Sequence, residues 1–172
     1  MTGKEEGISD YLAKINEILE EHRTIRSGVK LVGDSVSDQE ALASLKSMRS
    51  DWTPGRLELI SEKQRKLKQT MSFLEDGLRN HFAKEEDVLP ALLGEFLMRS
   101  LLLEHQKIIG KIDEAGLVAT NSKLEGLTEA ELESKDSEIK QKISDFSRRL
   151  EEHADKEELM LEMVIRALKA GK

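Results

Sequence analysis

The four histidines of this 172-residue chain are arranged as two matching pairs. The first pair is His22 and His81, and the second pair is His105 and His153. In both pairs the earlier histidine follows a glutamate, and the later one opens the string H-x-x-K-E-E. Imidazole nitrogens bind transition-metal ions well, so this repeated arrangement indicates a metal site.

Each H-x-x-K-E-E string also positions a carboxylate. Glu85 follows His81 by four residues, and Glu157 follows His153 by four residues. Residues four apart lie on the same face of a helix, about one turn apart. Two helices that each offer a histidine and a glutamate, with two more that each offer one histidine, could surround a pair of metal ions.

Composition narrows the possible classes of protein. The sequence contains no cysteine, which excludes disulfides, thiolate nucleophiles, and iron–sulfur or zinc sites built on sulfur. Its net charge of -7 argues against a nucleic-acid-binding protein, because no basic stripe is present to neutralise phosphates. The polar N-terminus lacks the apolar core of a signal peptide, and no stretch approaches a membrane span. We therefore expect a cytoplasmic protein of one domain, residues 1–172, in which residues 1–7 form a flexible tail.

Apolar residues that recur every three or four positions predict an all-α protein with four long helices. The predicted helices cover about residues 8–32, 54–90, 95–116 and 128–170. Pro90 indicates a break after the second helix, and residues 121–126 form the predicted loop before the last one. Within residues 33–50, a short extra helix is predicted from the apolar side chains Ala41, Leu42, Leu45 and Met48.

Local signals mark two of the predicted helix starts. Asp51 or Thr53 could cap the second helix, with Pro54 at an early helical position where its missing N–H costs little. At the start of the fourth helix, Thr128 and Glu131 fit a capping box.

All four histidines, together with Glu85 and Glu157, fall in register with the apolar stripes of their own helices. A single histidine on an apolar face is usually a hydrogen-bonded core residue. If about two in seven helical positions face a seam, four unrelated histidines would all do so roughly once in a hundred to two hundred trials. A buried carboxylate also needs a partner, and no lysine or arginine on the stripes is an obvious one. Metal coordination explains the whole set.

The ligand types indicate which metals fit. Four imidazoles and two carboxylates suit two first-row transition ions that share both carboxylates as bridges, whereas calcium prefers oxygen ligands alone. Each ion would keep one or two positions for a bridging oxide or hydroxide and for an outside ligand. We expect two non-haem iron ions, with manganese, mixed metals or zinc as alternatives, because protein ligands alone rarely fix the metal.

Spacing alone leaves the roles of the neighbouring residues open. Glu21, Glu104 and Glu152 precede three of the histidines and could orient imidazoles, although a solvated position fits their register better. Glu86 and Glu158 are expected to be solvated. Six apolar residues near the ligands would line a dry pocket for a small neutral diatomic, or serve only as core: Ile25, Met71, Leu74, Ile108, Leu150 and Met160.

The ordered set His, H-x-x-x-E, His, H-x-x-x-E on four successive helices resembles the hemerythrin-like proteins with the HHE cation-binding domain. The resemblance covers about residues 8–168. It implies an up-down-up-down four-helix bundle around a non-haem di-iron centre. By motif position, it implies that one iron is bound by His22 and His81, the other by His105 and His153, with Glu85 and Glu157 as bridges.

The sequence departs from the oxygen-carrying hemerythrins at two positions. Those proteins have H-x-x-x-H on the third helix, whereas here Ile109 follows His105 by four residues. Their last helix uses an aspartate five residues after its histidine, whereas here the carboxylate is Glu157, four residues after. The resemblance therefore favours members that sense iron or oxygen, handle nitric oxide or repair iron–sulfur clusters. The repair proteins often carry a cysteine-bearing N-terminal extension, which this chain lacks.

Three functions remain open at this stage. The leading hypothesis is a di-iron protein that binds or reacts with dioxygen or nitric oxide, for sensing, storage or detoxification. The second is a di-metal redox enzyme with peroxidase-like or nitric-oxide-reducing activity, or an iron–sulfur-cluster repair factor. The third is a metal-free structural bundle or helix-groove interaction module. We expect no nucleic-acid or membrane partner.

Overall fold

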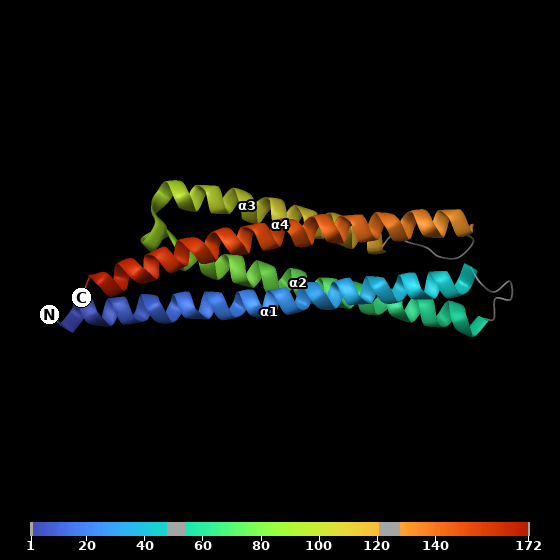
Figure 1. Cartoon of the computed structure of the whole chain (residues 1–172), viewed down its shortest axis with the longest axis horizontal. Helices are drawn as coiled ribbons and strands as arrows, with labels where there is room; N and C mark the ends of the chain where they lie inside the picture. The colour runs from blue at the N-terminus through green and yellow to red at the C-terminus, as the bar shows by residue number, and fades with distance from the viewer. Residues whose placement is uncertain (1, 48–53, 121–127, 172) are drawn as a thin grey trace.

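The chain folds into a bundle of four antiparallel helices. The computed structural model describes residues 2–47, 54–120 and 128–171. The helices are α1 (Thr2–Ser47), α2 (Pro54–Val88), α3 (Pro90–Thr120) and α4 (Glu129–Ala170). Helix α1 packs on α2 and α4, and α3 packs on the same two helices, so the order is up-down-up-down with both termini at one end (Figure 1). The predicted all-α bundle is confirmed.

Helix α1 is longer than the sequence suggested. It continues without a break to Ser47, so the segment expected to form a short extra helix is the last part of α1 instead. Residues 2–7, expected as a tail, form its first turns. No proline interrupts this segment, and alanine, leucine, lysine and glutamate favour helix, so one helix forms where two were expected. Met48 lies outside the described residues.

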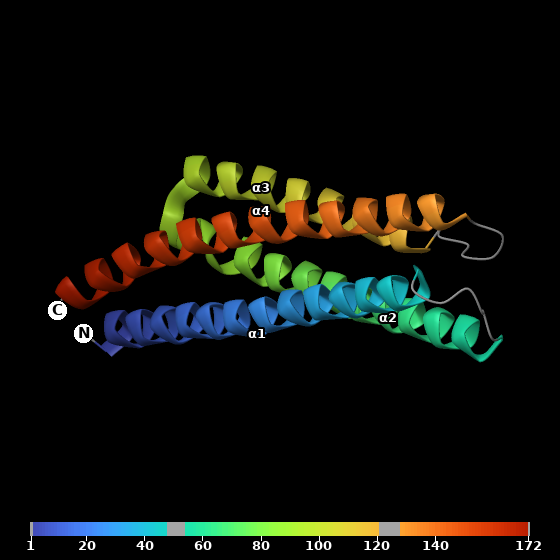
Figure 2. The same ribbon diagram turned by 45° about the vertical axis from the view of Figure 1, so that its right-hand side comes forward.

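The corner between α2 and α3 is tighter than predicted. Helix α2 ends at Val88 and α3 begins at Pro90, which fits the first helical position because its missing N–H needs no partner there. The predicted start near Glu95 corresponds to a kink inside α3. Gly94 adopts φ 78 and ψ 170 there, a conformation that favours glycine. Figure 2 shows this corner at the same end of the bundle as the termini.

The fourth helix begins as predicted. The Thr128 side chain accepts a hydrogen bond from the Glu131 backbone N–H at 3.3 Å, and Glu131 Oε2 accepts one from the Thr128 N–H at 2.8 Å. This reciprocal pair is the capping box. Helix α2 begins at Pro54, whereas its proposed caps, Asp51 and Thr53, and the predicted loop at residues 121–126 lie outside the described residues.

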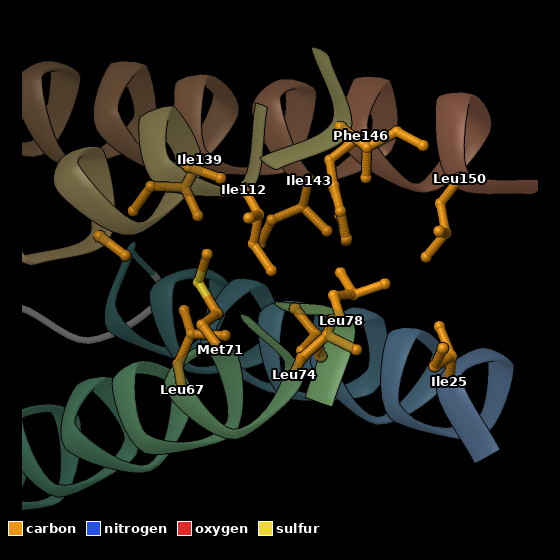
Figure 3. Packing of buried hydrophobic residues seen from close by; sticks show 14 of the residues in the cluster. Ile25, Leu67, Met71, Leu74, Leu78, Ile112, Ile139, Ile143, Phe146 and Leu150 are labelled. Carbon is orange, nitrogen blue, oxygen red and sulfur yellow. The ribbon is translucent and has the colours of Figure 1, made fainter. Parts of the chain in front are cut away.

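The interior consists of two apolar clusters with a polar layer between them. The large cluster lies toward the end away from the termini and includes Leu67, Met71, Ile143 and Phe146, which point toward one another across the bundle in Figure 3. The small cluster lies at the terminal end and comprises Ile15, Ile18, Val88, Leu89, Met98, Leu101 and Leu161. Among the described helices, none is both long and apolar enough to cross a membrane.

Candidate metal centre

The polar layer contains all six residues predicted as metal ligands. Helix α1 contributes one histidine and α3 another, while α2 and α4 each contribute a histidine and a glutamate. These six residues, the six-residue centre, are at most 3% exposed: His22, His81, Glu85, His105, His153 and Glu157. Their ligand atoms form two groups, each within 4.8 Å, and both groups contain Glu85 and Glu157. The helical spacing in the sequence thus brings all of them together.

Each buried carboxylate faces both histidine pairs. Glu85 Oε1 contacts His81 Nε2 and lies 3.3 Å from His22 Nε2, while Glu85 Oε2 lies 3.1 Å from His105 Nε2. Glu157 Oε1 lies 3.4 Å from His22 Nε2, and its Oε2 lies 3.2 Å from His153 Nε2. One oxygen of each glutamate is therefore directed to each pair, which is the arrangement that a bridging ligand requires.

A second carboxylate contacts the outer nitrogen of every histidine. The Nδ1 atoms of these rings lie 2.8–3.1 Å from glutamate oxygens, in the pairs His22–Glu158, His81–Glu21, His105–Glu86 and His153–Glu104. A carboxylate accepts a hydrogen bond, so it favours the tautomer with the proton on Nδ1. The lone pair of Nε2 is then directed into the centre, as metal ligation requires.

The lysines of the two H-x-x-K-E-E strings hold two of these outer glutamates. Lys84 donates a hydrogen bond to Glu21, and Lys156 donates one to Glu104 at 2.9 Å. The strings therefore supply, in order, an inward histidine, a lysine for an outer glutamate, an inward glutamate and an outer glutamate. This repetition in both halves is the sequence signal that could have identified the outer contacts.

Several expectations about the outer glutamates were wrong. Glu86 and Glu158 contact histidines rather than only solvent, and so do Glu21 and Glu104, for which a solvated position had seemed the better fit. Each points across to a histidine of a neighbouring helix, which the register of its own helix does not reveal. Glu152 is exposed, and the ion pair described for it is with Arg148 at 3.7 Å.

The inward-facing atoms fit a bound metal better than hydrogen bonding. Among the described residues, five buried atoms have close neighbours but no well-aligned hydrogen bond: Glu85 Oε2, His105 Nε2, His153 Nε2 and both oxygens of Glu157. Buried polar atoms are normally satisfied, because leaving them unpaired costs free energy. Two ligands at right angles, each about 2.1 Å from one ion, would lie about 3 Å apart. Four of the five inward histidine–glutamate separations, at 3.1–3.4 Å, agree with that arrangement, whereas the His81–Glu85 contact is closer.

Comparison with known proteins gives the family. The chain matches the model of the hemerythrin HHE cation binding domain over residues 13–165. It belongs to this family. No curated protein and no solved structure gave a significant match. The hemerythrin HHE domain is a cation-binding domain, and the six-residue centre lies within the matched segment and is able to hold metal.

Within the six-residue centre of the HHE domain, the facing charges shift the pKa values of His22 and Glu85 in opposite directions. Burial lowers the pKa of His22, but the facing carboxylates Glu157 and Glu85 outweigh burial and raise this pKa to about 10. Burial raises the pKa of Glu85, but the facing histidines His105, His22 and His81 outweigh it and hold this pKa well below its usual range. A raised pKa favours protonated His22, so a cation that bound through this imidazole would displace a proton.

A small cavity of about 10 Å³ adjoins one side of the centre of this HHE domain. Its apolar lining consists of Ile25, Phe82, Leu150 and Ala154, and its polar lining of His22, His81, His153, Arg26 and Glu151. Ile25 and Leu150 were among the predicted pocket residues. The other four predicted pocket residues are part of the apolar packing: Met71, Leu74 and Ile108 in the large cluster, and Met160 against the small one.

Phe82 and Ala154 were not singled out by the sequence. They occupy the same position in the two H-x-x-K-E-E strings, directly after the histidine. The Phe82 ring stacks on His105, with centroids 3.9 Å apart and planes at 6°. Alanine leaves space where phenylalanine would fill it, so the cavity lies beside His22.

Proposed function

We propose that this HHE-domain protein holds two non-haem iron ions and binds or reacts with dioxygen or nitric oxide, in sensing, storage or detoxification. One ion would be held by His22 and His81 and the other by His105 and His153, with Glu85 and Glu157 bridging them. The observation that carries this proposal is that both buried carboxylates face both histidine pairs, while five of the inward atoms make no well-aligned hydrogen bond within the described part of the chain.

The residues around the ligands support a centre that is ready to receive ions. The four outer glutamates accept hydrogen bonds from the Nδ1 atoms, so the rings present Nε2 inward without rearrangement. When bound, the ions would supply open coordination positions and one-electron chemistry. The chain itself orients the ligands and excludes bulk water, because every inward group is buried.

The size of the cavity and the charge around it favour a small uncharged ligand. Its volume of about 10 Å³ is close to the space that one water-sized molecule needs. Glu151, Asp155 and Glu158 surround Arg26 beside the cavity, so this region carries excess negative charge. Negative charge disfavours anions, whereas dioxygen and nitric oxide carry none.

The first test is metal analysis of protein purified without added metal or chelator. We expect about two irons per chain, the number that the two ligand groups would hold. Less than one metal per chain, persisting after anaerobic reconstitution with ferrous iron, would overturn the proposal and leave the metal-free structural bundle.

The second test distinguishes ligand binding from catalysis. The reduced, iron-loaded protein is exposed to dioxygen or nitric oxide, and the absorption spectrum and the products are followed together. We expect a spectral change with each gas that saturates at the iron concentration. Multiple turnovers with released product would favour the redox enzyme instead.

A further inference from the structure

Arg26 connects α1 to α4 beside the six-residue centre. Its guanidinium donates three hydrogen bonds to three carboxylates on α4. These are Nη1 to Glu158 at 2.7 Å, Nε to Glu151 at 3.1 Å and Nη2 to Asp155 at 3.0 Å. The arginine and its three partners are called the Arg26 cluster below.

The Arg26 cluster reaches a proposed metal ligand through one shared atom. Glu158 Oε1 accepts the hydrogen bond from Arg26 and also lies 3.1 Å from His22 Nδ1. The Arg26 side chain is only 32% exposed and lines the cavity next to His22. Arginine, glutamate and histidine thus form one continuous chain of contacts from the surface to the centre.

The other half of the molecule lacks this arrangement. The residue four positions after His105, which corresponds to Arg26, is Ile109. Glu86 corresponds to Glu158 and contacts His105 Nδ1 at 3.0 Å, but none of the described ion pairs joins Glu86 to a lysine or arginine. The Glu86 side chain is 41% exposed, compared with 33% for Glu158. The outer glutamate of His22 is therefore held more firmly than that of His105.

We propose that Arg26 is a positioning residue that makes the two ion positions unequal, by fixing Glu158 and through it the imidazole of His22. This inference rests on the proposed two-ion function. Without the guanidinium, Glu158 can move toward solvent, and the His22 ring then loses the acceptor that sets its tautomer and orientation. A single exposed ion pair would have little effect, but three charge-assisted bonds from one planar group constrain both side chains.

The chain offers a direct readout because each of its four histidines is a proposed ligand. Histidine labelled with the NMR-active nitrogen isotope gives separate imidazole signals for each residue, and zinc serves as a diamagnetic probe. In Arg26→Gln we expect the signals of His22 and His81 to need about 10- to 100-fold more zinc for saturation. The signals of His105 and His153 should saturate as in the unchanged protein.

Two further variants separate positioning from general destabilisation. Arg79→Gln is the matched control, because Arg79 also bonds two carboxylates, Glu75 on its own helix and Asp113 on α3, but lies away from the cavity. In Arg79→Gln, the four imidazole signals should saturate at the same zinc concentrations as in the unchanged protein. Arg26→Lys should restore part of the affinity, because a lysine keeps the charge but not the planar three-way contact.

The outcomes distinguish this inference from the proposed function. If the unchanged protein binds two zinc ions and Arg26→Gln shifts all four histidines equally, or none, the positioning role is overturned and the two-ion proposal stands. If the unchanged protein does not bind two ions, the proposed function fails and this inference fails with it. Circular dichroism of each metal-free variant checks that the bundle is folded.

Discussion

The lysines and histidines of the two H-x-x-K-E-E strings make matching contacts with outer glutamates in both halves of the molecule. In one half Lys84 contacts Glu21, which contacts His81 at 2.8 Å. In the other half Lys156 contacts Glu104, which contacts His153, also at 2.8 Å. The carboxylates that face both histidine pairs also correspond. The groups that would hold ions therefore repeat.

The surroundings of the two halves differ. Phe82 covers His105, whereas its counterpart Ala154 leaves a cavity beside His22. Arg26 fixes the outer glutamate of His22, whereas its counterpart is Ile109. On the proposed two-ion function, the residues that would hold the cations are the ones that repeat in both halves. Any difference in what the two ion positions do must come from the residues that do not repeat.

The largest effect should come from Glu85→Gln or Glu157→Gln, because each change removes a carboxylate that faces both histidine pairs. An amide is uncharged and offers only one acceptor oxygen, so it cannot bridge two cations. We expect iron content to fall from about two ions per chain to below one, measured by elemental analysis after reconstitution.

Glu152→Gln is the matched control, because Glu152 lies next to His153 but is exposed and faces away from the centre. It should retain full metal content. Retention of two ions by Glu85→Gln would show that the bridging assignment is incorrect.

Equal effects in the two halves are expected from Glu21→Gln and Glu104→Gln. Each change weakens the acceptor at Nδ1 of one histidine, His81 or His153, and should lower zinc affinity about 10- to 100-fold at that ion position. Competition with a coloured chelator measures the affinities. Strongly unequal losses would contradict the equivalence of the two lysine–glutamate–histidine sets.

Ala154→Leu should make the halves more alike by filling the cavity beside His22. Overpacking at this position costs about 1–3 kcal/mol of folding stability. If the diatomic ligand uses the cavity, we also expect its affinity to fall about tenfold, equivalent to about 1.4 kcal/mol of binding free energy. Metal content should not change. Ala83→Leu is the control, because Ala83 is exposed on α2. Unchanged nitric oxide affinity in the folded, metal-loaded Ala154→Leu protein would exclude the cavity as the binding space.

The pH dependence of the metal-free protein follows from the shifted pKa values of His22 and Glu85. The pKa of His22 is raised from 6.5 to about 10 in the folded state, so its stabilising effect is complete below pH 6.5 and lost as pH rises toward 10. The pKa of Glu85 is lowered from 4.5, so its contribution is present above pH 4.5 and lost in acid. The unfolding free energy of the metal-free protein should therefore be greatest between pH 4.5 and pH 6.5.

Urea unfolding with a chelator present, from pH 4 to pH 10, measures this profile. His22→Gln should remove part of the decline above pH 6.5. The rest should come from His153, because Glu157 and Glu104 outweigh burial and raise the pKa of that histidine as well. A decline of the same size in that variant would show that another group is responsible.

The smallest effect should come from Thr128→Ala, which affects neither half of the centre. Loss of the capping box should cost about 1 kcal/mol of unfolding free energy, measured by chemical denaturation. Zinc affinity should remain the same at both ion positions. A selective loss at one position would mean that the start of α4 influences the centre.

The six inward residues could be predicted from the sequence because helical periodicity converts spacing into a shared face. The repeated strings indicated that the outer glutamates have a shared role, but the histidine that each one contacts could not be predicted. Glu86 and Glu158 lie one residue beyond Glu85 and Glu157, and their surroundings depend on how close the neighbouring helix packs. The roles of Phe82 and Ala154 could not be predicted either, because a cavity is formed by side chains from several helices.

The errors in helix boundaries have a different cause. The segment after residue 32 was expected to leave the first helix because Gly33 and the polar residues that follow it resemble a loop. No proline ends the helix there, and α1 continues to Ser47. Conversely, Pro90 marked the end of α2 correctly, but the same residue opens α3. The sequence signal at Pro90 therefore located the corner between α2 and α3 but did not show how tight this corner is.

The polar layer between the two apolar clusters has a consequence for how the protein opens. In the metal-free protein this layer contains buried polar atoms that make no well-aligned hydrogen bond among the described residues. It separates the large and small apolar clusters, so the interior is least stable at this level of the bundle. We expect the terminal end, which contains the smaller core, to exchange its amide hydrogens and admit proteases first, and bound cations to suppress this local unfolding. Uniform protection along the whole length of the metal-free bundle would contradict this. Degradation in the cell would then follow metal supply, so a shortage of cation would shorten the lifetime of the protein as well as empty its centre.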